Sequence, residues 1–448
     1  MSSLVTDTSD DKDGTANRDN NSSSSSSSNN PIEKFKRYFN VEELIANLHK
    51  QRASSSKKVS TISSLYGKMY DTSNEKGERD FLADFRSHIW ITYRNNFHAL
   101  VPSPPTFPLT SDSGWGCMIR SGQMMLAEFL LRRKLGRDWR LDEPVSGSRN
   151  RSYSIAHKDI LLKFVDAPNV KCDFSIHRIV QVGLQYGKRP GDWYGPEAIS
   201  IVLRDLVNSH PHLNVEVYVA SSGVVVKKDV LNLVAGNNNY NDGNNKKSDD
   251  NVNNNTKKMS KDSVAINQNS KHDWSSDLFL IIPCSILGRG SSLKINEKFI
   301  NALCKIIDLP QSVGFIGGKP RHSVYFNGRC GNDIFYMDPH RVQNTVDYGA
   351  RFPTLEELLS YHSPTPRRMN AKEIDASLAL GFCIHNQDEF NNFCMEIEEI
   401  GKSTPMFFGV VDVNPMDTLS VDLMNSSGSN GKSSPTSVDE DDGEWDLL

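Results

Sequence analysis

The stretch of sequence that decides the fold is SDSGWGCMIRSGQMMLAEFLLRRKL, residues 111–135. From residue 118 onward its apolar residues recur at helical spacing, which predicts a buried helix over residues 118–135. Glycines flank Trp115 and the residues before them are of the types that begin helices, so a tight turn leads into this helix. Cys117 therefore lies at or beside the helix start, where unpaired N–H groups and the positive end of the helix dipole favour a thiolate.

The spacing of the cysteines limits the possible roles of the Cys117 thiol. The chain has seven cysteines, and no two of them are closer than 11 residues. That spacing argues against a disulfide framework and against a CxxC zinc site, and it indicates a reducing compartment. Cys117 is thus a candidate nucleophile, with a small buried side chain at a helix start as the simpler alternative.

A second candidate site is YMDPHRVQ, residues 336–343. Pro339 disfavours helix at Asp338, so we expect an extended segment with Asp338 and His340 on one face. The carboxylate could then orient the imidazole; the alternative is a turn that carries two exposed polar residues. His322, in the glycine-rich bend GFIGGKPRHSVY at 314–325, is the competing candidate base, but no carboxylate lies within two residues of it.

Further patterns predict the rest of the secondary structure. Pro196 suits a first helical position and opens a predicted helix over 196–208. Alternation over 215–219 resumes at 224–226, which predicts a strand pair, and the apolar run 278–282 suits a central strand. Residues 323–327 and 334–338 are expected to form a hairpin. A noisy helical pattern covers 32–49. Helices early and strands later predict an α+β fold with an antiparallel sheet.

Polar tracts limit how much of the chain can fold. Residues 1–30 contain 10 Ser and 5 Asn, and residues 236–270 contain 12 Asn. Such segments cannot bury enough apolar surface to offset the entropy of ordering. We expect disordered tails at 1–30 and 419–448, and one folded domain over 31–418 that carries a disordered insert at about 236–272.

The charge and hydropathy patterns exclude several classes of protein. A net charge of −4 gives no reason to expect nucleic-acid binding. The N-terminus lacks the basic and then apolar segments of a signal peptide, and the run at 278–287 is too short for a membrane helix. The sequence therefore indicates a soluble protein.

Six blocks of sequence, in order, resemble the autophagins, the cysteine proteases that process the ubiquitin-like modifier of autophagosome membranes. The resemblance covers about residues 81–411. The blocks are FLADFRSHIWITYRNNF, SDSGWGCMIRSGQMMLAEFLLRRKLGRDWR, DWYGP, PQSVGFIGGKP, FYMDPHRVQ and LALGFCIHNQDEFNNFC.

The resemblance implies a fold and a set of site residues. The fold would be papain-like, with a small extra α/β subdomain. Cys117 would be the nucleophile, His340 the base, Asp338 the residue that orients it, and Tyr93 a hydroxyl donor to the oxyanion. Two gates would close over the access groove: these are Trp193 and the loop Lys319, Pro320, Arg321 and His322. Some members carry a second cysteine four residues after the nucleophile, where this chain has Ser121.

The resemblance also implies a function. The chain would cleave after the C-terminal glycine of the modifier precursor and remove the modifier from phosphatidylethanolamine, without a metal or other cofactor. It would be a cytoplasmic monomer that meets autophagosomal membranes only transiently, through its substrate. Two alternatives stay open: a papain-like peptidase for another ubiquitin-like modifier, and a non-catalytic modifier-binding protein, against which the intact set of site residues argues.

The C-terminus carries one more candidate binding site. Trp445 and Leu448 are three apart and follow an acidic run. An extended peptide with this spacing can add to a sheet edge and fill two pockets, and the motif resembles the one by which autophagy proteins bind this modifier family. A solvated acidic tail is the alternative interpretation.

Overall fold

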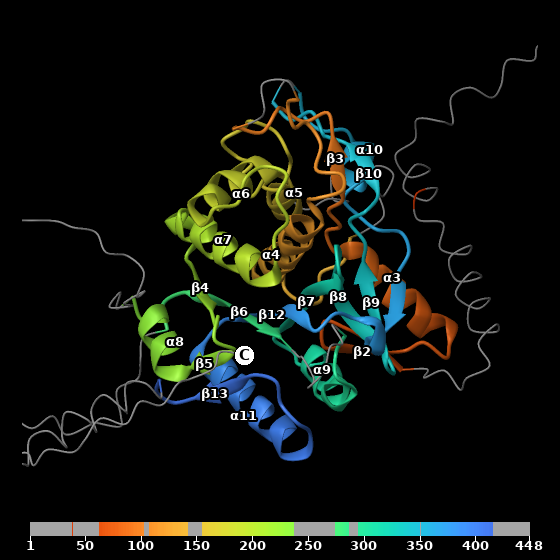
Figure 1. Ribbon diagram of the computed structural model, residues 1–448. Helices are drawn as coiled ribbons and strands as arrows, with labels where there is room; N and C mark the ends of the chain where they lie inside the picture. The colour runs from red at the N-terminus through yellow and green to blue at the C-terminus, as the bar shows by residue number, and fades with distance from the viewer. Residues whose placement is uncertain are drawn as a thin grey trace, which may run out of the picture.

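Nine of the described strands form one sheet at the centre of the molecule (Figure 1). The computed structural model describes residue 38 and residues 62–102, 107–141, 155–236, 274–285, 294–349 and 351–414. The strands of this sheet are β1 (Ile62–Leu65), β2 (Lys68–Asp71), β4 (Val215–Val219), β6 (Asp277–Ser285), β7 (Ser312–Lys319), β8 (His322–Cys330), β9 (Asp333–Met337), β11 (Arg367–Asn370) and β12 (Ser377–Ile384). Their order is β11-β9-β8-β7-β12-β6-β4, and β1 pairs with β8 and with β2.

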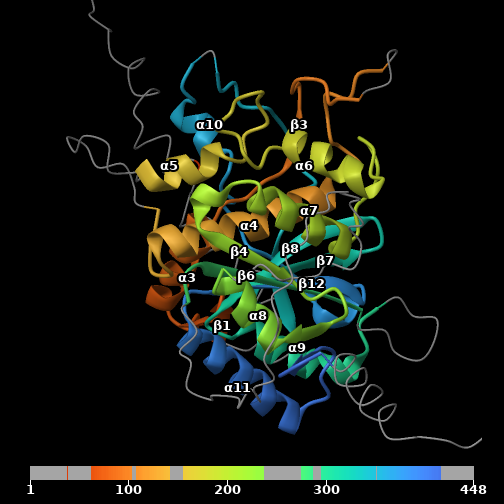
Figure 2. The ribbon, with the colours of Figure 1, turned by 90° about the vertical axis from the view of Figure 1, so that its left-hand side faces the viewer.

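Helices cover both faces of the sheet. The α-helices of the described residues are α3 (Glu75–Ser87), α4 (Cys117–Leu135), α5 (Ile155–Leu162), α6 (Ile176–Gly183), α7 (Pro196–Asn208), α8 (Lys227–Val234), α9 (Ile300–Ile307), α10 (Leu355–Leu359) and α11 (Gln387–Ser403). Figures 1 and 2 show α4 and α7 on one side of the sheet and α8, α9 and α11 on the other. The sheet is therefore a middle layer, which accounts for its apolar central strands.

Strand β6 shows why its sequence is a continuous apolar run. Successive side chains of a strand point to opposite faces. Phe279 and Ile281 belong to the hydrophobic core that also contains α4 and α7. Leu278, Leu280 and Ile282 belong to the second core, which includes α9 and α11. Both faces of β6 are buried over residues 278–282, so this part of the strand is apolar, and its polar residues lie at the two ends.

Most of the predicted elements, and the α+β fold class, are confirmed. Helix α7 has the predicted bounds, and α4 begins one residue earlier than predicted. The predicted strand 278–282 lies within β6, between β12 and β4, and the segments 323–327 and 334–338 lie in or next to the antiparallel hairpin of β8 and β9. The sheet is not wholly antiparallel, because β4 runs parallel to β6.

The predicted pairing of 215–219 with 224–226 is wrong. Strand β4 pairs with β6, whereas β5 (Val224–Val226) pairs in parallel with β13 (Gly409–Val411) in a separate two-stranded sheet. A turn closed by the Gly223 N–H to Ala220 C=O bond lies between β4 and β5. Alternation identifies a strand, but the partner comes from a segment far away in the sequence.

Several predictions fall outside the described residues. They concern the tails 1–30 and 419–448, the predicted helix over 32–49 apart from Tyr38, and the Asn-rich tract apart from residue 236. The flanking strands β4 and β6 are neighbours in one sheet, so the chain returns to the same sheet after the tract. In the described part of the chain, no helix has the length and apolar character to cross a membrane.

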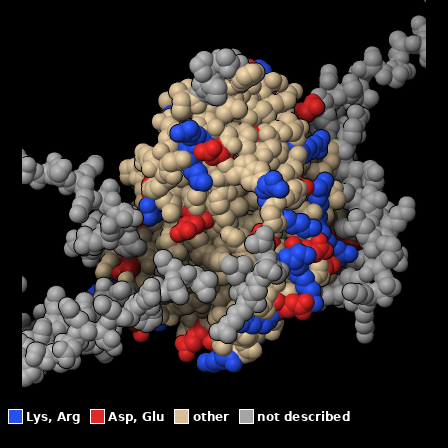
Figure 3. Space-filling view, in the orientation of Figure 1, with Lys and Arg blue, Asp and Glu red and all other residues tan. Residues whose placement is uncertain are grey.

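Charges are mixed on the face of the molecule in Figure 3. Basic and acidic side chains lie close to one another there, and much of the visible surface carries neither. This face gives no single-sign field of the kind that a nucleic-acid binder presents.

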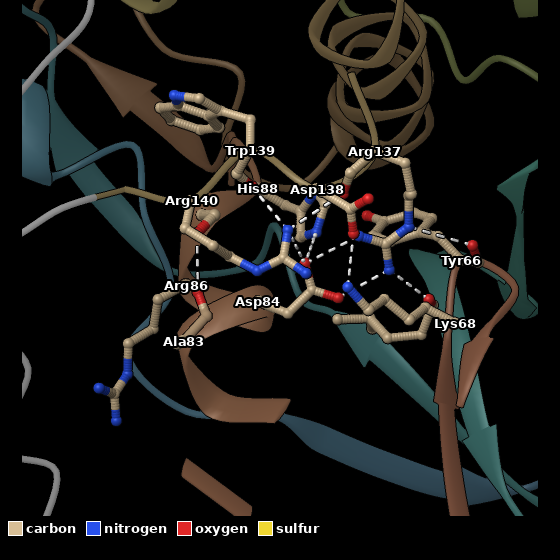
Figure 4. A network of polar contacts seen from close by, with 12 residues as sticks. Tyr66, Lys68, Ala83, Asp84, Arg86, His88, Arg137, Asp138, Trp139 and Arg140 are labelled. Carbon is tan, nitrogen blue, oxygen red and sulfur yellow. Dashed lines mark hydrogen bonds and ion pairs between the residues drawn. The ribbon is translucent and has the colours of Figure 1, made fainter. Parts of the chain in front are cut away.

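A buried polar network joins α3 to the segment after α4 (Figure 4). The fully buried Asp84 binds Arg137 at 2.7 Å and Arg140 at 3.0 Å. The His88 ring lies between Asp84, at 3.2 Å, and Glu128 of α4, at 2.5 Å. Burial would lower the pKa of His88, but these two carboxylates raise it. The network fixes the end of α4 that is remote from Cys117.

We expect Asp84→Ala to destabilise the fold by about 3–5 kcal/mol, because it leaves buried cations without their counter-charge. Urea unfolding would measure the loss. The matched control is Asp80→Ala on the same helix, where an exposed pair with Lys76 contributes little. Equal stability of the two variants would contradict this interpretation.

Candidate active site

Cys117 is the first residue of α4, and Asp112 holds the loop before it. The N–H groups of Trp115 and Gly116 bond to the Asp112 carbonyl at 3.2 and 2.9 Å. A Cβ on Gly116 would lie 2.4 Å from the Asp112 carboxylate, so this position requires glycine. Gly116 is also the N-cap residue, and no side chain caps the helix. The N-cap residue therefore offers no side-chain acceptor to the first N–H groups of α4, which lie beside the thiol.

A buried ion network makes this loop rigid. The Asp112 carboxylate accepts bonds from the Arg94 N–H at 2.8 Å and from Arg120 at 2.7 Å. Arg120 is fully buried and also binds Asp166 at 2.8 Å, and Asp166 accepts the Ile176 N–H at 2.9 Å. Segments from β3 (Tyr93–Asn95), α4 and α6 are thereby tied together behind Cys117.

Asp338 and His340 form a hydrogen-bonded pair, but they do so on a turn. Strand β9 ends at Met337, and the residues that follow leave the sheet. Asp338 Oδ1 accepts the His340 N–H at 3.0 Å and lies 2.6 Å from His340 Nδ1. The expected extended segment is thus wrong, whereas the expected proximity of the two side chains is correct. Both side chains are mostly buried, at 14% and 21% exposed, so the alternative of two exposed polar residues is also wrong.

The segment around Tyr93 fixes this turn from behind. Trp90 Nε1 donates to the Asp338 carbonyl at 2.8 Å, and the Tyr93 N–H donates to the Pro339 carbonyl at 2.8 Å. Strand β3 then runs parallel to β10 (Val342–Asn344). The Tyr93 ring meets the His340 ring edge to face, with centroids 5.3 Å apart. The structure thus brings Tyr93 beside the candidate base.

The thiol and the imidazole shift each other's ionisation. Burial would raise the pKa of Cys117, but the neighbouring His340, the Ser323 N–H and Tyr93 lower it below its ordinary value. Burial would lower the pKa of His340, yet its hydrogen bond with Asp338 and the neighbouring Cys117 raise it to about 9. His340 Nε2 is buried and makes no bond of ordinary geometry to any described residue. This arrangement favours a thiolate beside an imidazolium.

The neighbouring groups stay in the ionisation states that the pair requires. Burial would raise the pKa of Asp338, but the bonds from His340 lower it to about 2. Burial and the adjacent Cys117 raise the pKa of Tyr93 well above its ordinary value. Asp338 is therefore a carboxylate, and Tyr93 keeps a proton to donate.

We expect Cys117 to be alkylated by iodoacetamide faster than the buried structural cysteines at pH 6–8. A lowered pKa leaves thiolate present below the usual range, whereas burial raises the pKa of Cys172 and of Cys304 to about 11. Peptide mass spectrometry would give the rate at each thiol. His340→Ala should move the midpoint of Cys117 alkylation to higher pH. If Cys117 reacted no faster than Cys172, the ion pair would be contradicted.

Both expected gates line a small cavity with Cys117. The cavity has a volume of about 130 Å³, and its walls include Trp193 and residues 319–322. Arg321 places its guanidinium 5.9 Å from the centroid of the Trp193 ring, which is 41% exposed. Lys319 binds Glu373 at 2.9 Å. The predicted glycine-rich bend is mostly strand, in β7 and β8, and only the turn at 320–321 between them is a loop.

His322 stacks on the candidate base and does not replace it. The rings of His322 and His340 are nearly parallel, with centroids 3.7 Å apart. Burial and the charge of His340 lower the pKa of His322. The two oxygens of Asp338 bind His340 and Arg367. The competing assignment of His322 as the base therefore has less support.

In the described ranges, one group has the spacing of metal ligands. Its atoms, from His322, Asp338 and His340, lie within 4.8 Å of one another. The hydrogen bond between Asp338 and His340 and the stacking of the two rings account for this spacing, and we assign no ion to it.

Some residues of the site were not predicted from the sequence, and two predicted binding residues lie outside the described part of the chain. Trp90 and Arg367 contact the site from distant segments, whereas Arg120 binds Asp112 from α4 itself, and no local pattern marks any of the three. Ser121 is buried, and its hydroxyl lies 3.2 Å from that of Ser323. Trp445 and Leu448 fall outside the described part of the chain.

Comparison with known proteins gives a consistent result. Residues 78–396 match the peptidase C54 catalytic domain. The cysteine protease ATG4B of Xenopus laevis is 34% identical over 363 residues, which cover 80% of this chain and 85% of that protein. The cysteine protease ATG4A of Homo sapiens is 31% identical over 358 residues, covering 78% and 82%. The cysteine protease ATG4A of Oryza sativa subsp. indica is 32% identical over 392 residues, covering 84% and 74%.

Proposed function

Because the chain belongs to the peptidase C54 family, we propose that it hydrolyses the peptide bond after the C-terminal glycine of an autophagy ubiquitin-like modifier precursor. The family makes it an autophagy-related cysteine-type peptidase. One observation carries the proposal: Cys117, whose pKa is lowered by His340 and Tyr93, lines a cavity that Trp193 and Arg321 border.

In the proposed mechanism, His340 holds the proton of Cys117, and the thiolate attacks the glycine carbonyl carbon. The carbonyl oxygen becomes an oxyanion, which accepts hydrogen bonds from the Tyr93 hydroxyl and from the N–H at the start of α4. Collapse breaks the C–N bond, and the leaving amine takes the proton from His340. Neutral His340 then takes a proton from water, whose hydroxide cleaves the thioester and restores the thiolate.

The cavity supports a preference for glycine. Its volume of about 130 Å³ leaves little space around Cys117. Trp193 and Arg321 both line it, and the Arg321 guanidinium is 5.9 Å from the centroid of the Trp193 ring, so we expect a substrate segment that reaches the sulfur to be narrow. A residue without a side chain before the scissile bond fits that requirement best, and the gates have to part to admit it.

The same acyl transfer extends to a lipid conjugate. If the leaving amine belongs to phosphatidylethanolamine, cleavage of the amide releases the modifier from the membrane by the same steps. We therefore propose delipidation as a second reaction of this site, carried out by a cytoplasmic enzyme that reaches the autophagosomal membrane through its substrate.

The test is incubation of the purified chain with precursors of several ubiquitin-like modifiers that carry short C-terminal extensions. Intact mass should show loss of the extension after glycine for the autophagy modifier with the parent and not with Cys117→Ser. Cleavage of another modifier alone would favour the different-substrate alternative. Binding of the autophagy modifier without cleavage would favour the non-catalytic one.

The C-terminal motif is expected to act as a tether. Trp445→Ala with Leu448→Ala should weaken modifier binding and slow delipidation of sparse membrane substrate more than cleavage of abundant precursor, because a tether raises effective concentration. Titration of a peptide of residues 436–448 against the modifier checks this directly. No binding at millimolar peptide would mean that the motif is not used.

A further inference from the structure

A cation from the edge of the sheet binds the outer oxygen of Asp338. Arg367 is the first residue of β11, the edge strand beside β9, where it pairs with Tyr336. Its Nη1 lies 2.6 Å from Asp338 Oδ2. The Arg367 side chain is 62% exposed, whereas that of Asp338 is 14% exposed. The guanidinium therefore approaches the carboxylate from the solvent side.

The three oxygens of Asp338 have partners from three different residues. Oδ1 faces His340 Nδ1 at 2.6 Å, Oδ2 faces Arg367 at 2.6 Å, and the carbonyl accepts from Trp90 at 2.8 Å. A carboxylate held at one oxygen can rotate about its Cβ–Cγ bond, and a donor on the second oxygen opposes that rotation. The direction of Oδ1 toward the imidazole thus depends on Arg367 as well as on His340.

Arg367 also places a positive charge one contact away from His340, on the far side of Asp338. The titratable and charged groups around that ring come from five elements or turns: they are Cys117, Tyr93, His322, Asp338 and, one contact further, Arg367. Arg367 is a fixed positive charge beyond the carboxylate. It partly offsets the negative charge by which Asp338 stabilises the imidazolium.

We propose that Arg367 is a positioning residue of the active site, which holds the Asp338 carboxylate in the orientation that aims His340 at Cys117. Four side chains would then be in successive contact: Arg367, Asp338, His340 and Cys117. Of these, only His340 and Cys117 would contact the substrate. The proposal deepens the proposed function and rests on it for the substrate used below. The pairing itself can be tested without that substrate.

The neighbouring Arg368 offers a matched control. It is the next residue on β11, so its side chain points to the other face of the strand. Its contact is with Asp333, at 3.9 Å, at the far end of β9. Arg367→Ala and Arg368→Ala therefore remove the same charge and the same side chain from adjacent positions, and only the first touches Asp338.

The experiment measures kcat, KM and the pH profile of precursor cleavage for the parent, Arg367→Ala, Arg367→Lys and Arg368→Ala. Arg367→Ala should lower kcat roughly three- to tenfold with KM unchanged, because an exposed charge-assisted bond is worth little more. The alkaline limb should move to higher pH by about half a unit, because a nearby cation no longer opposes the imidazolium. The kcat of Arg367→Lys should lie between those of the parent and Arg367→Ala, because lysine keeps the positive charge but lacks the planar guanidinium.

Iodoacetamide labelling of Cys117 across the same pH range provides the readout that needs no modifier. The alkaline transition in the rate of Cys117 labelling should move to higher pH in Arg367→Ala and stay in place in Arg368→Ala. If the parent cleaves no precursor but this shift appears, the proposed substrate is wrong and the assignment of Arg367 stands.

Three results would overturn the proposal. One is equal kinetics and equal pH profiles for Arg367→Ala and Arg368→Ala. Another is a rise in KM alone, which would make Arg367 a substrate contact. The third is a loss of activity that follows a fall in melting temperature with the pH profile unchanged, which would make the contact merely structural.

Discussion

Replacing Cys117 with alanine is expected to lower precursor cleavage by at least about 10⁴-fold, to background, while the fold stays intact. The thiol lines the cavity, and replacing it with a methyl group removes the nucleophile by the smallest change available there. Precursor cleavage followed by intact mass, with circular dichroism and thermal melting, measures both parts. Cys284→Ala is the matched control, because this half-buried cysteine at the end of β6 lies outside the cavity.

Cleavage by the Cys117→Ala protein at a rate near that of the parent would refute the assignment. A folded variant with normal modifier binding and no cleavage is the expected outcome, and it would also separate a peptidase from a modifier-binding protein.

Asp338→Asn is expected to lower kcat by about 10²–10⁴-fold with the fold intact. An amide offers its N–H₂ group as readily as its oxygen, so the His340 Nδ1–H loses a dedicated acceptor and the ring loses its orientation. The negative charge that raises the pKa of His340 to about 9 also disappears. The imidazolium should therefore lose its proton at lower pH, and the alkaline limb of the activity profile should move down.

The pH–rate profile and the melting temperature measure this effect. Asp333→Asn, at the other end of β9, is the matched control and should leave both unchanged. A variant that keeps the parent's kcat and alkaline limb would show that Asp338 does not orient the base.

The sequence was informative where the structure depends on local pattern. The helical period of residues 118–135 predicted α4 and placed Cys117 at its start, and Pro196 marked the first residue of α7. The β8–β9 hairpin was predictable because its strands are adjacent and a short turn joins them. In each case the determining contacts lie within a few residues of one another.

Long-range pairing could not be predicted from the sequence, because its determining contacts join distant segments. Strand β5 finds its partner β13 far along the chain, and neither segment carries a mark that identifies the other. Asp338 and His340 were paired correctly, although the backbone between them is a turn. Arg367 and Trp90 reach Asp338 only because the sheet and the β3 segment fold against that turn. The positions of Tyr93 and Trp193 near Cys117 were expected only from the family resemblance.

The most direct test of the account uses the modifier with a C-terminal propargylamide in place of its last glycine. A thiolate held at the position of the scissile carbonyl adds to the alkyne and forms a stable thioether. Tandem mass spectrometry of the digested adduct should find the modifier on Cys117 alone, with no adduct in Cys117→Ala. A modifier adduct on any other of the seven cysteines, or none on the folded parent, would contradict the account.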